Sequence, residues 1–146
     1  MRFRFFLITA LALCVTLAYG KDNPISQLFA ARSLNCHFDP GTRTVWLGSK
    51  PKTSATHSGQ DVHFDAIDIK SQSARVIAKS GAGDVKVLPA RAGLSFIELA
   101  PDAIHLTTVF PIYGKAHDFI AVDTRHEIVS GAPMDEEYYG SCQIFQ

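Results

Sequence analysis

Three consecutive runs of β-branched and aromatic residues lie in the second half of the chain, and they constrain its fold most strongly. The runs cover residues 94–99, 104–110 and 119–126, with breaks containing proline or glycine between them. Residues of these types pack well on a pleated sheet, and runs of this length between turn signals are typical of strands. The rest of the chain is therefore expected to extend and close an antiparallel sheet.

Residues 1–20 are predicted to be a signal peptide. Two arginines precede an apolar run over residues 5–17, and Ala18 and Gly20 take the −3 and −1 positions of a cleavage site before Lys21. The run is too short for a membrane-spanning helix, which needs about 20 apolar residues. We therefore expect a secreted or periplasmic protein with no membrane span after cleavage; an uncleaved anchor is the weaker alternative.

The charge of the expected mature chain argues against two classes of partner. Loss of Arg2 and Arg4 leaves 12 of the 14 basic residues against 14 acidic ones. Nucleic-acid binding needs a clustered basic face, and membrane-surface binding needs a polybasic or strongly amphipathic segment. The mature sequence contains neither. The partners that remain are an unknown small ligand or an envelope protein.

Two cysteines remain after cleavage, Cys36 and Cys142, near the two ends of the expected folded part. An isolated pair in an oxidising compartment usually forms a disulfide, and its spacing lacks the C-x-x-C pattern of redox or metal sites. Bonded cysteines have Cα atoms within about 7 Å of each other. The first and last strands are therefore expected to be neighbours or to face each other.

Residues 21–32, between the signal and the sheet, are predicted to form a short helix or an arm. Asn23 can cap a helix, Pro24 suits its first turn, and Ile25, Leu28 and Phe29 recur at helical spacing. The antiparallel β domain is expected to occupy residues 33–146.

The first part of that domain is divided by turn signals. Residues 39–42, Asp-Pro-Gly-Thr, fit a type II turn, after which residues 43–47 would return as the second strand. Trp46 in that strand is expected to anchor the core, with a place in a ligand pocket as the alternative. Residues 48–60 are polar and rich in Gly, Ser, Thr and Lys, which predicts a mobile loop.

The following segments alternate as strands do. The alternation in residues 61–70 changes phase near Ala66, which predicts a β-bulge. Residues 73–79 and 85–88 are expected to be strands joined by a turn over residues 80–84. Residues 138–145 would form the closing strand, after an exposed acidic run at residues 135–137.

This pattern predicts the fold class. It amounts to eight or nine short strands with turn signals about every 8–12 residues. Such spacing indicates an all-β protein, with a single antiparallel meander closed into a small barrel or sandwich. A parallel sheet would need crossover helices, which the pattern lacks.

Residues 119–128 hold two candidate binding residues. His126 shares a strand face with aliphatic residues and is expected to be a mostly buried, hydrogen-bonded side chain. Arg125 lies on the other face with Asp123, and with Glu98 these residues could form a polar cluster on neighbouring strands. Arg125 is expected to form a cross-strand ion pair, and binding of an anionic ligand is the alternative.

His63 and Asp65 are weak candidates for a metal site. Residues two apart on a strand project from the same face, so an imidazole and a carboxylate could bind a divalent metal or act together as a base. A zinc site usually needs three or four ligands. A solvated polar face is the favoured interpretation, and no metal is expected.

Four short strings carry a resemblance to a known group of proteins. Residues 94–98, 107–110, 121–126 and 138–142 resemble the corresponding strings of small secreted bacterial proteins that have no assigned function. The resemblance covers about the last third of the chain. It implies a bacterial, periplasmic setting and transfers no activity.

The function hypotheses follow from what the sequence contains. There is no nucleotide, haem or flavin signature and no Gly-x-Ser-x-Gly elbow, so no cofactor is expected. We favour a non-enzymatic exported binding or interaction domain that uses the barrel mouth or residues 48–60. The alternatives are a small envelope hydrolase or metalloenzyme using His63 and Asp65, and a structural envelope protein.

Overall fold

The computed structural model describes residues 23–145, with the side chain of Ala116 left aside. The signal peptide predicted for residues 1–20 lies outside the described residues. One helix, ten strands and one 3-10 turn are described, and they are, in chain order, α1 (Pro24–Ala30), β1 (Leu34–Phe38), β2 (Thr42–Leu47), β3 (Lys50–Ala55), β4 (Gln60–Asp68), β5 (Ser73–Ala78), β6 (Gly81–Ala90), β7 (Gly93–Ala100), β8 (Ala103–Tyr113), η1 (Lys115–His117), β9 (Phe119–Val129) and β10 (Ala132–Ile144).

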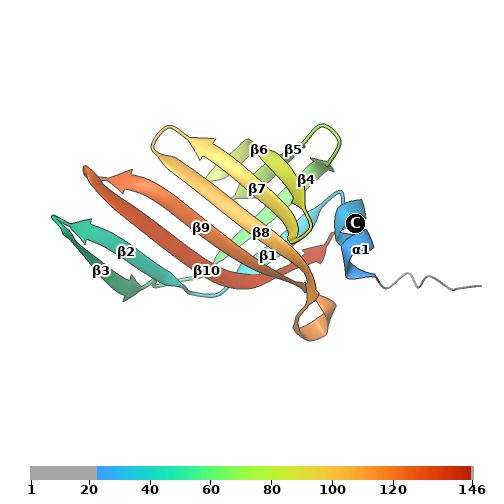
Figure 1. The fold of residues 1–146 in the computed structure, drawn as a ribbon, viewed down its shortest axis with the longest axis horizontal. Helices are drawn as coiled ribbons and strands as arrows, with labels where there is room; N and C mark the ends of the chain where they lie inside the picture. The colour runs from blue at the N-terminus through green and yellow to red at the C-terminus, as the bar shows by residue number, and fades with distance from the viewer. Residues whose placement is uncertain (1–22, 146) are drawn as a thin grey trace, which may run out of the picture.

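Eight of the strands close into an antiparallel barrel (Figure 1). Their order is β1-β4-β5-β6-β7-β8-β9-β10, and β10 pairs with β1 to complete the ring. Closure leaves those eight strands without an open edge, which removes a common route to aggregation. The all-β prediction is confirmed, and the architecture is a barrel.

The disulfide prediction is confirmed at this closure. Cys36 on β1 lies directly opposite Cys142 on β10, with their Cα atoms 4.0 Å apart and their sulfur atoms bonded. The two cysteines are 106 residues apart in the chain. For a loop of that length, the chain-entropy model gives a stabilisation of about 4–5 kcal/mol. The bond therefore fastens the first strand of the barrel to the last.

β2 does not return along β1, so the predicted hairpin at residues 39–42 is wrong. β1 and β2 follow each other along the long strand β10, β1 pairing with its residues 140–144 and β2 with its residues 134–137. Gly41 lacks the positive φ that a type II turn needs, and a Cβ added there would lie 1.8 Å from the carbonyl oxygen of Glu137. Glycine at this position therefore lets the chain pass close to β10.

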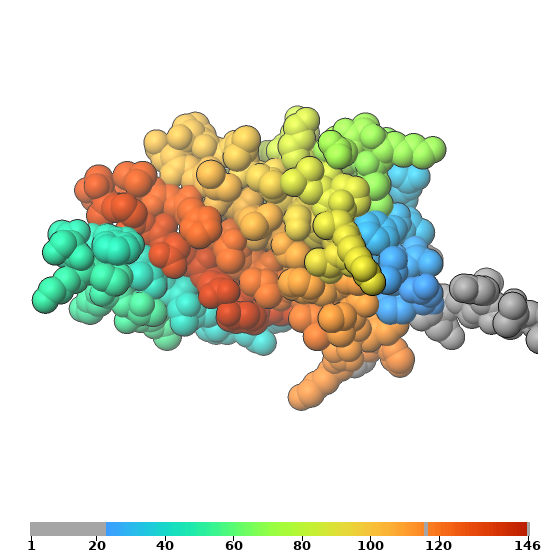
Figure 2. Space-filling model, in the orientation of Figure 1, coloured from blue at the N-terminus to red at the C-terminus, as the bar shows by residue number. Residues whose placement is uncertain are grey.

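The predicted mobile loop over residues 48–60 is also wrong. β3 occupies residues 50–55 and forms a hairpin with β2 through Gly48, whose φ of 66° suits glycine. The β2–β3 hairpin adds two strands to the sheet alongside β10, at the end of the molecule opposite α1 (Figures 1 and 2). All six residues of β3 are exposed, so the strand has no buried face and its sequence lacks the apolar alternation that would have indicated a strand.

Smaller differences concern where strands begin. The bulge near Ala66 is confirmed by a φ of 50° and a register shift between Asp65 and Asp68. β6 already begins at Gly81, so the turn before it is shorter than predicted. The acidic run at residues 135–137 is not wholly exposed, since the alternation of β10 turns Glu136 into the barrel, where it is 4% exposed.

Of the two predictions for residues 21–32, a short helix or an arm, the structure has the helix, α1, which lies at one end of the barrel. The side chain of Asn23 caps the helix by accepting a hydrogen bond from the backbone N–H of Ile25 at 3.0 Å, and Pro24 opens it. Leu28 is fully buried against the apolar core, and α1 contacts β7 and β8. The largest fully buried side chains are Phe38, Phe64, Phe96, Leu28, Leu34, Ile67 and Leu94.

Candidate functional site

The inward faces of five neighbouring strands carry a row of ionisable residues. Strand register places each residue directly opposite the next, and the row holds two acidic and three basic side chains. We call this set the charged row; it consists of Glu98, His105, Arg125, Glu136 and Arg43. Thr107 and Asp123 lie two residues from His105 and Arg125 along the same strands, nearer the core and opposite each other.

A cavity of about 630 Å³, here called the cup, opens inside the barrel beside these residues. Its volume is in the range of pockets that hold a small organic ligand. Its apolar lining comes from Phe64, Val76, Ala78, Val85 and Phe96. Its polar lining includes Gln60, Glu98, His105, Thr107, Asp123 and Arg125.

Asp123 is the most deeply buried carboxylate of the cup, at 5% exposed. The Thr107 hydroxyl donates to its Oδ1, and Nε2 of Gln60 donates to its Oδ2 at 2.6 Å. β4 and β9 are not neighbours in the sheet, so the bond from Gln60 crosses the barrel interior. Burial raises the pKa of the Asp123 carboxyl, while these two hydrogen bonds and the charges of His105 and Arg125 oppose the rise.

The two arginines of the charged row differ in how completely their nitrogen atoms are paired. Arg43 donates from Nε at 2.6 Å and from its terminal nitrogen at 2.5 Å to Glu136. Arg125 uses a terminal nitrogen to pair with Glu127, two residues further along the same face of β9. Nε of Arg125 is buried and has no hydrogen-bond partner in the part of the chain that the structure describes. Unpaired buried donors are rare in proteins, and an ordered water or a bound polar group is the usual partner of such an atom.

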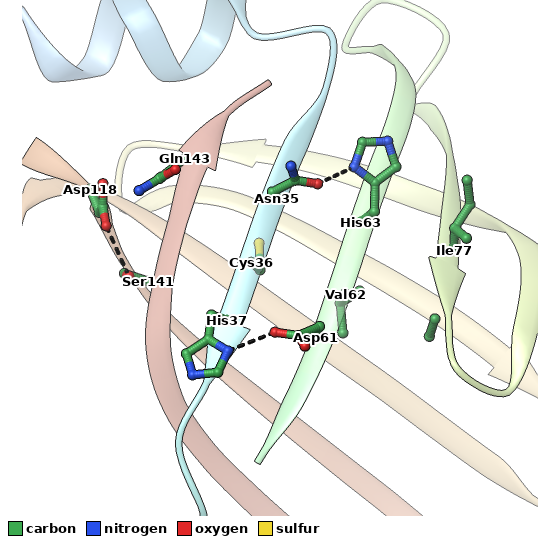
Figure 3. Close-up of a pocket in the computed structure, with 11 residues that line it drawn as sticks. Asn35, Cys36, His37, Asp61, Val62, His63, Ile77, Asp118, Ser141 and Gln143 are labelled. Carbon is green, nitrogen blue, oxygen red and sulfur yellow. Dashed lines mark hydrogen bonds and ion pairs between the residues drawn. The ribbon is translucent and has the colours of Figure 1, made fainter. Parts of the chain in front are cut away.

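A second groove, of about 450 Å³, lies on the outer face of the barrel (Figure 3). His37 on β1 contacts Asp61 on β4 through Nδ1 at 2.6 Å, which raises the pKa of the histidine. Ser141 occupies the other side of His37 in the register, but its hydroxyl points to Asp118 at 3.5 Å. The Nε2 atom of His37 lies 4.0 Å from Asp39. The serine-to-histidine hydrogen bond of a hydrolase is therefore not formed by these residues.

The structure gives His63 and Asp65 separate partners on the outer face of β4. Nδ1 of His63 is hydrogen-bonded to the side-chain oxygen of Asn35 at 2.5 Å (Figure 3). Asp65 accepts two hydrogen bonds from Arg75, at 2.9 and 2.5 Å. Among residues 23–145, no three His, Cys, Asp or Glu side chains are grouped so that they could hold a metal ion.

The candidates Trp46 and His126 both lie on the outside of the barrel. They line a groove of about 650 Å³ together with Ile104, Ile128 and Pro133. Trp46 is 41% exposed, so its predicted core role is wrong. His126 is exposed, which contradicts the predicted burial. The aliphatic face of β9 proves to be its outer face.

Arg125 is the one predicted binding residue that lines the cup, and it does so with Asp123 and Glu98. Its contact is an ion pair with Glu127 within β9, where a cross-strand pair was predicted. Sequence reasoning missed Gln60 and Thr107. The polar alternation of Thr107 with His105 on β8 is a signal that could have indicated a polar inner face.

Comparison of the chain with protein-family models, with curated proteins and with solved structures finds no match. Within residues 23–145, none of the helices has the length and apolar character needed to cross a membrane. The function must therefore be argued from the geometry of the cup.

Proposed function

We propose that this protein is a non-enzymatic binding domain that holds a small organic ligand in the cup. The observation that carries the proposal is a cavity of about 630 Å³ inside a closed barrel, lined by apolar side chains and by hydrogen-bonding groups. Ligand pockets typically combine a hydrophobic lining with a few placed polar groups.

The architecture supports the same proposal. A barrel of eight strands has an interior just wide enough to be filled by side chains or to hold one small ligand. Here α1 and the large apolar side chains fill one end, whereas the cup occupies the interior next to the loop before β4. Ser58 and Gly59 in that loop line the cup, which agrees with the hypothesis that the ligand enters near residues 48–60.

The proposed setting is a secreted or periplasmic one, in a bacterium. The disulfide between Cys36 and Cys142 supports an oxidising compartment, because cytosolic thiols are kept reduced. The test is intact-mass analysis of protein recovered from the producing cells. A chain that begins at Lys21 and lacks free thiols would support export, and a full-length chain with free thiols would contradict it.

Ligand binding in the cup can be tested with a fragment library and a matched pair of variants. Ala78 faces inward and lines the cup, whereas Ala82 lies on the neighbouring strand and faces outward opposite Ile77. Ala78→Trp should fill the cup, and Ala82→Trp adds the same side chain outside it. Ligand-observed NMR would detect weak fragments, and amide shifts would map their position.

The expected result is a set of fragments that bind the wild type and Ala82→Trp but not Ala78→Trp. Their amide shifts should gather on the residues around Asp123 and Val85. Fragments that bind all three proteins equally, or shifts confined to the outer face, would contradict the proposal.

A further inference from the structure

Acidic groups outnumber basic ones on the inner face around the cup. Four carboxylates face inward on these strands: Glu98 and Asp123, which line the cup, and Glu127 and Glu136, which do not. Arg43 pairs with Glu136 and Arg125 pairs with Glu127, which leaves two carboxylates without an arginine or lysine in contact. Lys79 belongs to the exposed rim. The cup is therefore electrostatically suited to a cation and unsuited to an anion.

Of the two carboxylates without an arginine or lysine in contact, Asp123 is more deeply buried than Glu98. Among residues 23–145, no arginine or lysine forms an ion pair with it, and its two hydrogen bonds come from the neutral side chains of Thr107 and Gln60. A carboxylate has about four acceptor sites, so two remain for a ligand. A buried charge without a contacting counter-charge is costly, and a bound cation would relieve that cost.

Glu98 adds negative charge on a neighbouring part of the cup. Its nearest basic group is His105, whose Nδ1 lies 3.7 Å from the carboxylate and which balances the charge only when protonated. A Cβ added at Gly83 would lie 3.1 Å from Oε1 of Glu98, so the carboxylate rests over a residue without a side chain.

The unpaired Nε of Arg125 indicates a second group on the ligand, in addition to the cation. It is a buried donor, so the group that satisfies it must be an acceptor. Asp123 and Arg125 are two residues apart on one face of β9, which places their Cα atoms about 7 Å apart along the strand. A ligand with an ammonium group and an oxygen two or three bonds away can reach both side chains.

The apolar lining of the cup indicates the third part of the ligand. Val76 and Val85 come from β5 and β6, which are at least three strands away from Asp123 on β9 around the barrel. A hydrocarbon or aromatic body directed away from the ammonium would lie against them.

We infer that the ligand of the cup is a small amphipathic organic cation, whose ammonium contacts Asp123 and whose neighbouring oxygen accepts a hydrogen bond from Arg125. This inference rests on the proposed function. It specifies the ligand class, which a polar cavity alone does not define.

The test uses four related probes on the wild-type protein. Phenylalaninol carries the ammonium, the oxygen and an aromatic body; 3-phenylpropan-1-ol lacks the ammonium; 2-phenylethylamine lacks the oxygen; and 3-phenylpropionate is an anion. Isothermal titration calorimetry gives the affinities, and amide shifts give the binding position. Phenylalaninol should bind at least about tenfold more tightly than 3-phenylpropan-1-ol, since a charge-assisted hydrogen bond is lost. It should also bind more tightly than 2-phenylethylamine.

Two variants assign these preferences to residues. Asp123→Asn should abolish the preference for phenylalaninol over 3-phenylpropan-1-ol, whereas Asp84→Asn, at an exposed acid of β6, should preserve it. Arg125→Lys keeps the charge but removes the Nε donor, so it should reduce only the preference over 2-phenylethylamine. The probe comparison on the wild type needs no variant, so it stands even if Asp123→Asn fails to fold.

The two proposals fail in different ways. Binding of 3-phenylpropan-1-ol or 3-phenylpropionate in the cup as tightly as phenylalaninol would overturn the cationic class but leave the cup as a binding site. Failure of both amines to bind at millimolar concentration, while other fragments occupy the cup, would do the same. The binding function itself fails if fragments bind Ala78→Trp and the wild type equally, or if their amide shifts are confined to the outer face.

Discussion

The two ends of the barrel interior are built from the same strands, yet they differ in chemistry. At the end closed by α1, Leu28, Leu34 and Leu94 are fully buried among other apolar side chains. Further along the strands, the inner face carries Asp123 and Glu136, also buried but charged. The inward-facing alternation continues across both regions.

The difference shows that the core and the candidate site occupy the same inner face of the strands. They are separated by their positions along the strands. Apolar burial and the disulfide near one end supply stability that tolerates unpaired polar groups at the other. Proteins commonly break packing rules at functional sites and compensate elsewhere. If this division is correct, substitutions at the two ends should differ in their effects on stability and on ligand binding.

The largest expected effect is at the closure of the barrel. Replacing both Cys36 and Cys142 with serine should lower the free energy of unfolding by about 4 kcal/mol, because the unfolded chain regains the freedom of a loop of about a hundred residues. Urea denaturation of the variant would measure the loss, and reduced wild-type protein serves as its control. An unchanged denaturation midpoint would show that strand pairing alone holds β1 to β10.

The next effect concerns the apolar end. Leu28→Ala should cost about 3 kcal/mol, because Leu28 is fully buried and its removal leaves a cavity under α1. Ile25→Ala on the same helix is the control, since Ile25 is 45% exposed and should change stability little. Fragment affinity for the cup should survive Leu28→Ala at temperatures where the variant is folded. Loss of that affinity would mean that the two ends are not separable.

Ion pairs inside and outside the barrel sharpen the comparison. Arg43→Gln leaves the carboxylate of Glu136 buried without its partner and should cost about 2 kcal/mol. Arg75→Gln breaks the pair with Asp65 on the outer face, where water replaces the lost partner, and should change the denaturation midpoint little. Equal effects of the two substitutions would show that the charged row is solvated like the outer surface.

Features set by local sequence were predicted well. The strands between residues 94 and 128, the cap of α1 and the bulge at Ala66 depend on nearby residues, and each is confirmed. The disulfide was predictable because the sequence has only two cysteines after the predicted signal peptide.

Features set by distant residues were predicted poorly. Turn chemistry at Pro40 and Gly41 suggested a hairpin, but β2 is positioned by β10, and the contact of Arg43 with Glu136 spans 93 residues. Likewise, the aliphatic face of β9 suggested that His126 was buried, because apolar residues usually face inward. A polar cup reverses that expectation, and Gln60, which crosses the barrel to Asp123, leaves no local pattern that reveals it.

The smallest expected effect has the opposite sign and concerns Asp123. Its pKa is raised in the folded protein by burial, so its contribution to stability is fully present below the unfolded value of about 3.9 and is lost as the pH rises through the folded pKa. The Asp123→Asn variant has no ionisable group at this position, so it does not lose stability as the pH rises through that pKa. The amide can still accept from Thr107, and Gln60 can rotate to accept from the new amide nitrogen.

Asp123→Asn should therefore raise the free energy of unfolding by about 1 kcal/mol at pH 7, and the gain should shrink as the pH falls toward 4. Urea denaturation of wild type and variant across that pH range measures the difference, in which the other titrating groups cancel. Asp84→Asn, at an exposed position, should show no such pH-dependent gain. A variant that is less stable than the wild type at pH 7 would mean that the carboxylate is held favourably in the empty cup, and the strain that motivates a cationic ligand would be absent.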